Sequence, residues 1–237
     1  MSEPFSWTNG EFDQYAAEYD AALARGLSLS GEDKSYFAEG RIVWLAGLLK
    51  QFDERPQHCL DFGCGIGSAA PFLFSLLDAE QVTGVDVSPT SLALARRIIA
   101  SDRARFLQLD AYQPCEEIDL AFCNGVFHHI PGPERKPAVA YVHRALRPGG
   151  LFALWENNPW NPGTRLVMSR IPFDRDAVTV SAPQARRLLV TAGFEILRTD
   201  FLFIFPKMLK QLRFIEPWVT RLPLGGQYQV LCRKRAR

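Results

Sequence analysis

The stretch CLDFGCGIG, residues 59–67, decides how the rest of the sequence is interpreted. An apolar run of strand length passes through three closely spaced glycines into a helix-like segment. Glycine tolerates positive φ and has no Cβ to hold a ligand away from the backbone, while a helix N-terminus offers unpaired N–H donors. The stretch therefore predicts a strand, turn and helix that bind a nucleoside-type cofactor. A tight turn without a ligand would have the same pattern.

A second signal lies one predicted strand further along the chain. In VTGVDVSP, residues 82–89, Asp86 ends an apolar run and follows Gly67 by 19 residues. A carboxylate at this place can accept hydrogen bonds from both hydroxyls of a ribose, although Asp86 could instead cap the helix that begins after Ser88. The glycine spacing is G-x-G-x-G, with Ser68 where a dinucleotide-binding protein has its third glycine. This departure disfavours a nicotinamide-dependent oxidoreductase.

Apolar runs of strand length alternate with segments of helical periodicity through most of the chain, which is typical of a parallel sheet covered by helices on both faces. We predict an α/β fold with a doubly wound, mostly parallel seven-stranded sheet and an antiparallel last strand. The expected strands are 58–62, 81–87, 104–109, 118–123, 151–155, 195–205 and 227–233, and the expected helices include 34–51, 89–100, 134–146 and 183–192.

At 237 residues the chain has the length of one domain, and we predict a single domain over 1–237, with N-terminal lid helices over about 1–52 and an insertion at about 206–226. In the insertion, apolar residues recur at helical spacing beside Lys207 and Lys210. Such a helix could complete the core over an edge strand or rest on an anionic membrane surface. We favour the core role, which would bury Leu212, Ile215 and Trp218.

Composition excludes several classes of function. The 27 basic and 26 acidic residues leave a formal charge of +1, which disfavours nucleic acid as a partner. The five cysteines form no CxxC pair and have no zinc spacing with histidine, so we expect reduced thiols and no metal. A start without a basic and apolar leader, and the lack of an apolar run of about 18 residues, predict a cytoplasmic protein.

Five motifs in order resemble those of class I S-adenosylmethionine (SAM)-dependent methyltransferases: LDFGCGIG, VTGVDVSP, the acid of LQLDAY, DLAFCNGVFHHI and LRPGG. They cover about residues 58–155. Within this class the sequence is most similar to the small-molecule branch of ubiquinone and menaquinone biosynthesis, and FDQYAAEYD, residues 12–20, extends the likeness towards the N-terminus. The resemblance implies SAM as cofactor and S-adenosylhomocysteine as product.

The resemblance also implies roles for individual residues in holding SAM. The methionine part, the ribose and the adenine of SAM would each be held by a different group of residues. A lid helix and a basic side chain would complete the site. Tyr19 would belong to the lid or pack in the core, and Arg41 would pair with the SAM carboxylate or face solvent. The remaining positions are Asp61, Gly63 and Gly65 for methionine, Asp86 for ribose, Val87, Asp110 and the Ala111 N–H for adenine, and the Asn124 carbonyl for the SAM ammonium.

Catalysis would need a proton acceptor only if the methyl acceptor is a hydroxyl or an acidic carbon. His128 and His129 follow the fourth predicted strand, where such sites open, and either could act as a base or be structural. We prefer His129. The segment WENNPWNP, residues 155–162, follows the next strand and would form either a polar substrate pocket or a turn-rich loop.

The sequence thus predicts methyl transfer from SAM to a small-molecule or lipid-linked acceptor. A catalytically silent module that binds SAM or a partner is the alternative, and an oxidoreductase is a weaker one. The methylated atom and the oligomeric state are left open.

Overall fold

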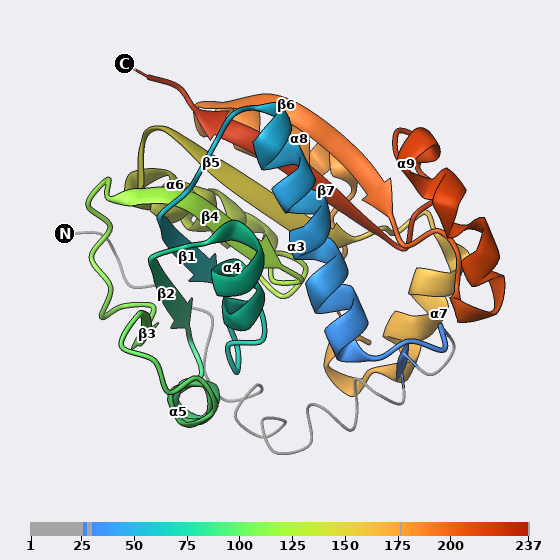
Figure 1. The fold of residues 1–237 in the computed structure, drawn as a ribbon, viewed down its shortest axis with the longest axis horizontal. Helices are drawn as coiled ribbons and strands as arrows, with labels where there is room; N and C mark the ends of the chain where they lie inside the picture. The colour runs from blue at the N-terminus through green and yellow to red at the C-terminus, as the bar shows by residue number, and fades with distance from the viewer. Residues whose placement is uncertain (1–25, 28–29, 176, 237) are drawn as a thin grey trace.

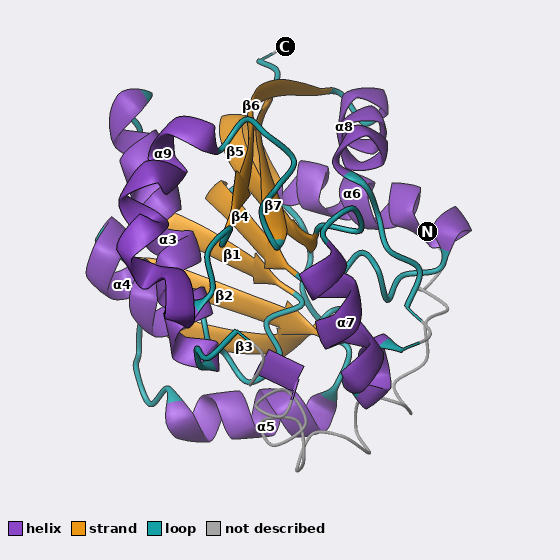
Figure 2. Ribbon diagram, turned by 90° about the vertical axis from the view of Figure 1, so that its right-hand side faces the viewer, coloured by secondary structure: helices purple, strands orange, loops and turns teal. Residues whose placement is uncertain are grey.

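A computed structural model describes residues 26–27, 30–175 and 177–236 of the chain. These residues form a seven-stranded sheet in the order β3-β2-β1-β4-β5-β7-β6 (Figures 1 and 2). β7 is antiparallel to both of its neighbours, and the other pairings are parallel. The predicted fold class is therefore confirmed. The strands are β1 His58–Phe62, β2 Gln81–Asp86, β3 Ala104–Gln108, β4 Ile118–Asn124, β5 Leu146–Asn157, β6 Phe194–Leu202 and β7 Gln227–Lys234.

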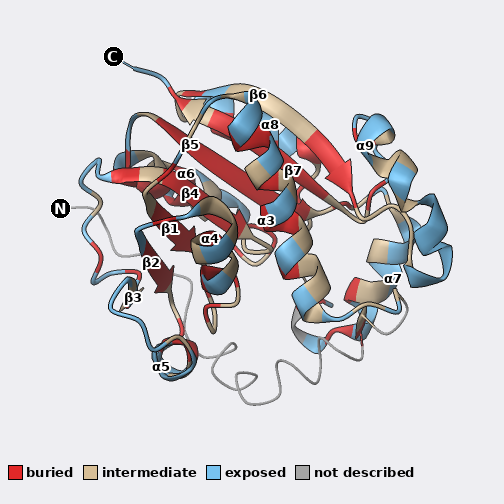
Figure 3. Cartoon of the chain, in the orientation of Figure 1, coloured by how far each residue is buried: buried red, intermediate tan, exposed pale blue. Residues whose placement is uncertain are grey.

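Helices cover both faces of this sheet and bury two separate apolar clusters (Figures 2 and 3). One face packs against α3 (Lys34–Gln51), α4 (Ala70–Leu77) and α5 (Pro89–Ile98), and the other against α6 (Arg135–Ala145) and α8 (Ala182–Thr191). Helix α7 (Pro162–Arg170) lies between β5 and α8. Two short 3-10 turns also occur in the connections: η1 (Gly132–Glu134) precedes α6, and η2 (Pro172–Asp174) follows α7. The predicted doubly wound arrangement follows from these two covered faces.

The helix after β2 begins where the sequence predicts. The Ser88 hydroxyl accepts a hydrogen bond from the Ser91 N–H at 3.1 Å, and Pro89 occupies the first helical position. Both features favour a helix start because the hydroxyl pairs one free N–H and proline has none to leave unpaired. The helix start places the end of β2, with Asp86, directly beside the glycine turn.

β5 is longer than predicted. The LRPGG stretch, residues 146–150, ends the predicted helix 134–146 and precedes the predicted strand 151–155, but it lies inside β5 as an irregularity. Ile118 pairs with Leu146, and the register then shifts before Leu120 pairs with Leu151. Gly149 takes a φ of +79°, which glycine adopts without strain. The residues that signal a turn therefore form a bulge, and both sides of the bulge stay paired to β4.

The insertion between β6 and β7 does not form the core helix that we favoured. It consists of a 3-10 segment, η3 (Lys207–Ile215), and one helical turn, α9 (Glu216–Val219). Trp218 is 76% exposed and Leu212 is 38% exposed, while Ile215 is half-buried. The prediction of a buried core helix was wrong, because the helical spacing of apolar residues does not show whether another element of the fold covers them.

Polar contacts hold this insertion to the start of the α3 region. The Arg213 guanidinium pairs with Glu32 at 2.9 Å and lies over the Tyr36 ring, and the Lys207 N–H donates to the Ser30 carbonyl. Because the insertion follows the carboxyl end of β6, it lies at the edge of the sheet where the parallel strands end (Figure 1). The exposed apolar side chains beside this edge are Met208, Leu209, Leu212, Phe214 and Trp218.

No helix in the described ranges is long and apolar enough to cross a membrane. An exposed apolar segment with basic side chains can still rest on an anionic lipid surface. Lys207 and Lys210 are both exposed beside the apolar residues. The exposure therefore argues against the core role, and the surface role stays a prediction.

We expect the protein to float with anionic liposomes at low salt and to stay behind with neutral ones, because the lysines attract anionic headgroups and the apolar side chains insert. The double variant Lys207→Glu/Lys210→Glu and the variant Trp218→Ala should each reduce the floated fraction. A protein that remains in the soluble fraction with anionic liposomes at low salt would contradict the surface role.

Candidate functional site

The chain forms the predicted glycine turn after β1, but the three glycines are needed for different reasons. A Cβ on Gly63 would lie 2.3 Å from a methyl of Val126, and one on Gly67 would lie 3.0 Å from the Phe106 ring. At Gly65, which takes a φ of +52°, a Cβ would meet no described atom within 4 Å. Close packing therefore requires Gly63 and Gly67 to lack a side chain, and Gly65 alone borders space that a ligand can use.

Asp86 links this turn to the start of the next helix. One carboxylate oxygen accepts a hydrogen bond from the Gly65 N–H at 2.8 Å, and the other accepts from the Ser88 N–H at 2.9 Å. Asp86 thus contacts the start of α5, as the capping alternative expected, but the side chain that caps this helix is that of Ser88. No local pattern predicts the hydrogen bond from Gly65 to Asp86, which fixes the position of the glycine turn.

Asp61 is a buried carboxylate at the end of β1. No hydrogen-bond donor to Asp61 is found among the described residues. Burial and the negative charge of Asp86 raise the pKa of Asp61 to about 7, against the opposing effect of Arg41. A cationic ligand at this place would favour the ionised carboxylate.

Arg41 supplies a positive charge to the same region. It is 7% exposed, and its guanidinium donates to the Gln227 side chain at 3.2 Å, so the solvent-facing alternative was wrong. Asp61 thus has one acidic neighbour, Asp86, and one basic neighbour, Arg41, both of which act on its charge. Such a set matches a ligand with both an amino and a carboxylate group.

The other predicted cofactor residues lie at the same edge of the sheet. Asn124, at the end of β4, has a buried side-chain oxygen with no described hydrogen-bond partner. Val87 is partly buried against the core, and Asp110 and Ala111 are exposed after β3. The Ala111 N–H already donates to the Gln108 carbonyl at 3.0 Å, which leaves the Asp110 carboxylate as the group able to meet an adenine. Tyr19 lies outside the described residues.

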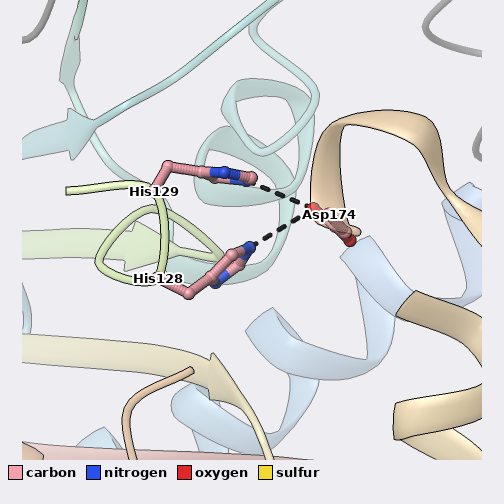
Figure 4. A group of neighbouring side chains, drawn as sticks. All are labelled: His128, His129 and Asp174. Atoms are coloured by element: carbon pink, nitrogen blue, oxygen red, sulfur yellow. Dashed lines mark ion pairs between the residues drawn. The ribbon is translucent and has the colours of Figure 1, made fainter. Parts of the chain in front are cut away.

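The two histidines after β4 differ in burial and in partners. His128 is buried, and its Nδ1 lies 2.6 Å from a carboxylate oxygen of Glu156 on β5. The other oxygen of Glu156 accepts the Phe127 N–H at 2.7 Å. Both rings direct Nε2 towards one oxygen of Asp174, at 3.4 Å for His128 and 3.2 Å for His129 (Figure 4). The side chain of His129 is 17% exposed, so it is the more accessible ring.

The electrostatics separate the two rings further. Burial disfavours a charged His128, yet Glu156 and Asp174 outweigh burial and raise the pKa of its imidazole. Burial lowers the pKa of His129, and the hydrogen bond to Asp174 only partly offsets this effect. The pKa of Asp174 is lowered by the two imidazoles despite burial. The two shifts thus have opposite directions: they favour the protonated form of His128 and the neutral form of His129.

Asp174 is a site residue that the sequence analysis missed. It belongs to η2, after α7, and stands 46 positions beyond His128 in the chain. Its sequence context, IPFDRD, has no feature that points to the histidines. Only the return of the chain from α7 to the edge of the sheet brings the groups together.

The asparagines of segment 155–162 make contacts typical of the turn-rich alternative. Asn158 is fully buried, and its amide donates to the carbonyls of Pro223 and Gly225. Asn161 caps α7 by accepting the Thr164 N–H at 3.0 Å. The Asn158 amide thereby ties the end of β5 to the insertion before β7.

Comparison with known proteins agrees with this geometry. Residues 60–152 match a family described as a methyltransferase domain. This part of the chain is therefore similar to methyltransferase domains, as the sequence motifs predict. The glycine turn, Asp86 and the histidine pair all fall within the matched residues, and Asp174 and Arg41 lie outside them.

Relatives with a named activity match only part of this chain. The trans-aconitate 2-methyltransferase of Paracidovorax citrulli is 31% identical over 145 residues, which are 58% of this chain and 54% of that protein. The chain spans about half the length of the curated trans-aconitate methyltransferases that it matches. The likeness to the quinone-biosynthesis branch stays a prediction.

Solved structures share the fold at low sequence identity. A SAM-dependent methyltransferase from Mesorhizobium loti has a TM-score of 0.56 at 20% identity, over 74% of this chain and 90% of that chain. The [4+2]-cyclase SpnF has a TM-score of 0.61 at 20% identity, over 99% of this chain and 98% of that chain. The second likeness shows that this fold also supports reactions of another class, so the site must carry the functional argument.

We expect Asp86→Ala to weaken SAM binding by roughly 1.5–3 kcal/mol, because charge-assisted hydrogen bonds to the ribose are lost. Isothermal titration calorimetry measures this change, with Asp102→Ala as a control on an exposed acid outside the site. Since Asp86 also holds Gly65, the melting temperature of the variant without ligand must be measured as well. An unchanged dissociation constant in a folded Asp86→Ala protein would remove the ribose assignment.

Proposed function

We propose that this protein transfers a methyl group from SAM to a small-molecule acceptor. The observation that carries the proposal is the buried Asp61 carboxylate, which has no described hydrogen-bond donor and lies beside the turn at Gly65. SAM has two positive groups, an ammonium and a sulfonium, and one carboxylate. Asp61 and Arg41 are matched in charge to the ammonium and the carboxylate, respectively.

Other residues would complete the cofactor site. Asp86 is proposed to accept the ribose hydroxyls, Asp110 to accept the adenine amino group, and the Asn124 carbonyl to meet the ammonium. Bound SAM supplies the electrophilic methyl, so the protein contributes mainly orientation and electrostatics. The parallel strands β1, β2, β3 and β4 present these residues at one edge, which supports a single extended site.

The acceptor is proposed to be small, and the relatives named as trans-aconitate methyltransferases support this size class. A lipid-linked acceptor would fit the same site if the exposed segment 207–219 rests on a membrane. The atom that receives the methyl group follows from the acceptor.

The direct test measures binding and transfer separately. SAM and S-adenosylhomocysteine should raise the melting temperature and bind at about micromolar affinity, while NAD should do neither. SAM with a deuterated methyl group, incubated with a panel of small acids, phenols and lipid-linked acceptors that includes trans-aconitate, should give a product with the matching mass increase. Stoichiometric SAM binding without transfer to any acceptor would favour a catalytically silent module, and stabilisation by NAD alone would favour an oxidoreductase.

His129 is proposed as the catalytic side chain on the acceptor side, with His128 as its neighbour. We expect His129→Ala to lower turnover by about 10²-fold while the affinity for SAM is unchanged, because a group that acts on the acceptor proton is removed. Steady-state kinetics with the identified acceptor and calorimetry with SAM measure the two effects.

The matched control is His58→Ala. His58 begins β1, away from the carboxyl ends of the strands where the proposed site lies, so this variant should keep wild-type turnover. If His129→Ala lowers turnover by less than about threefold, His129 only packs against its neighbours.

A further inference from the structure

The group formed by His128, His129 and Asp174 has the geometry of a metal site. One ring nitrogen from each histidine and one oxygen of Asp174 all lie within 4.8 Å of one another (Figure 4). We propose that these three side chains bind one divalent transition-metal ion at the acceptor side of the site. The proposal rests on the proposed function for its role in catalysis, but not for the binding of the ion.

Two of the three distances between the ligand atoms agree with ligation of a single ion. With metal–ligand bonds of about 2.1 Å, neighbouring ligand atoms lie roughly 3.0–3.4 Å apart in octahedral or tetrahedral geometry. The two nitrogen-to-oxygen distances, 3.4 Å from His128 and 3.2 Å from His129, fall in or close to this range. By contrast, the hydrogen-bonded pair of His128 and Glu156 is at 2.6 Å. The third distance, between the two histidine nitrogens, is within 4.8 Å, and these atoms would have to approach further to share one ion.

Glu156 supplies the support that metal-binding histidines usually have. A histidine ligand commonly donates its other ring N–H to a carboxylate, which fixes the tautomer and the ring orientation. The Glu156 carboxylate meets Nδ1 of His128 and is itself held by the Phe127 N–H. Nε2 of His128 is thereby directed towards Asp174. The backbone is fixed as well, because the His128 carbonyl accepts the Val178 N–H at 3.1 Å.

The charges also favour a cation. Two carboxylates, Glu156 and Asp174, are buried around the two imidazoles. A proton on His128 balances only one of them. Arg135, whose charge also acts on this region, donates to the carbonyls of Ile130 and Val178. A divalent ion would balance both carboxylates without a proton.

The chemistry of the ligands selects the class of ion. Two imidazoles and one carboxylate suit zinc, cobalt, iron or manganese, whereas magnesium and calcium prefer oxygen ligands. Three protein ligands leave a position for water or a substrate oxygen. An acceptor hydroxyl bound there would lose its proton more readily, so the ion would take over the task assigned above to the His129 side chain. The expectation of no metal considered only ligand spacing along the chain and could not include Asp174.

Binding can be tested with the metal alone. Protein freed of metal by dialysis against a chelator is titrated with Co²⁺, whose visible absorption reports its ligands, and with Zn²⁺ in competition with a chromophoric chelator. We expect one equivalent to bind and to raise the melting temperature. Asp174→Asn and His129→Ala should each remove this binding, and Glu156→Gln should weaken it by about 10–100-fold. His58→Ala should bind the metal as the wild-type protein does.

Asp174→Asn keeps the size and an amide oxygen, so it separates ligation from folding. Its melting temperature without metal should fall because the contacts of the carboxylate with the two imidazoles are lost, so the test is the further rise caused by metal, which only the wild-type protein should show. Absence of one-equivalent binding in the wild-type protein, or equal binding in Asp174→Asn, would overturn the proposal and leave a hydrogen-bonded cluster. If metal binds but no acceptor is methylated, the proposed function fails while the metal site stands.

Discussion

The hydrogen bonds of Asp86 join the two halves of the cofactor side of the site. Its carboxylate holds the Gly65 N–H on the turn after β1 and the Ser88 N–H at the start of α5, so the ends of two parallel strands have a fixed relation. Asp61 lies at the end of the neighbouring strand, and the charge of Asp86 adds to the effect of burial on its pKa. A carboxylate that is used to shape the turn therefore also makes the region favourable for a cation.

A second set of bonds builds the acceptor side from three distant parts of the chain. Glu156 on β5 holds the backbone and the ring that follow β4, and η2 brings Asp174 to the same rings. The parallel pairing of β4 with β5 aligns Asn124 with Trp155, directly before Glu156. Because the strands run in the same direction, their carboxyl ends deliver the histidines and the supporting carboxylate to one place.

The sequence predicted the elements of the sheet more fully than it predicted the contacts of the site. Strand and helix order follow from local periodicity and from glycine and proline positions, which depend on few neighbours. The LRPGG stretch shows the limit, because a turn signal became a bulge once both flanks paired with β4. Asp174 shows a stronger limit, because nothing local distinguishes it from a surface acid. The bond from Asp86 to Gly65 likewise depends on the approach of two strands.

The insertion before β7 shows why apolar spacing alone did not decide a functional surface. Its apolar residues follow a helical period, but the chain there forms a 3-10 segment and a single helical turn held by Arg213 and backbone bonds. Burial depends on whether another element covers the apolar side, and the described residues leave Phe214 and Trp218 exposed. Because β6 ends at the same edge as the other parallel strands, this exposed side shares an edge with the residues proposed to bind SAM and the acceptor. An acceptor held in a lipid surface would thus approach the protein from the edge of the sheet that carries the proposed site residues, which is the arrangement that a lipid-linked substrate requires.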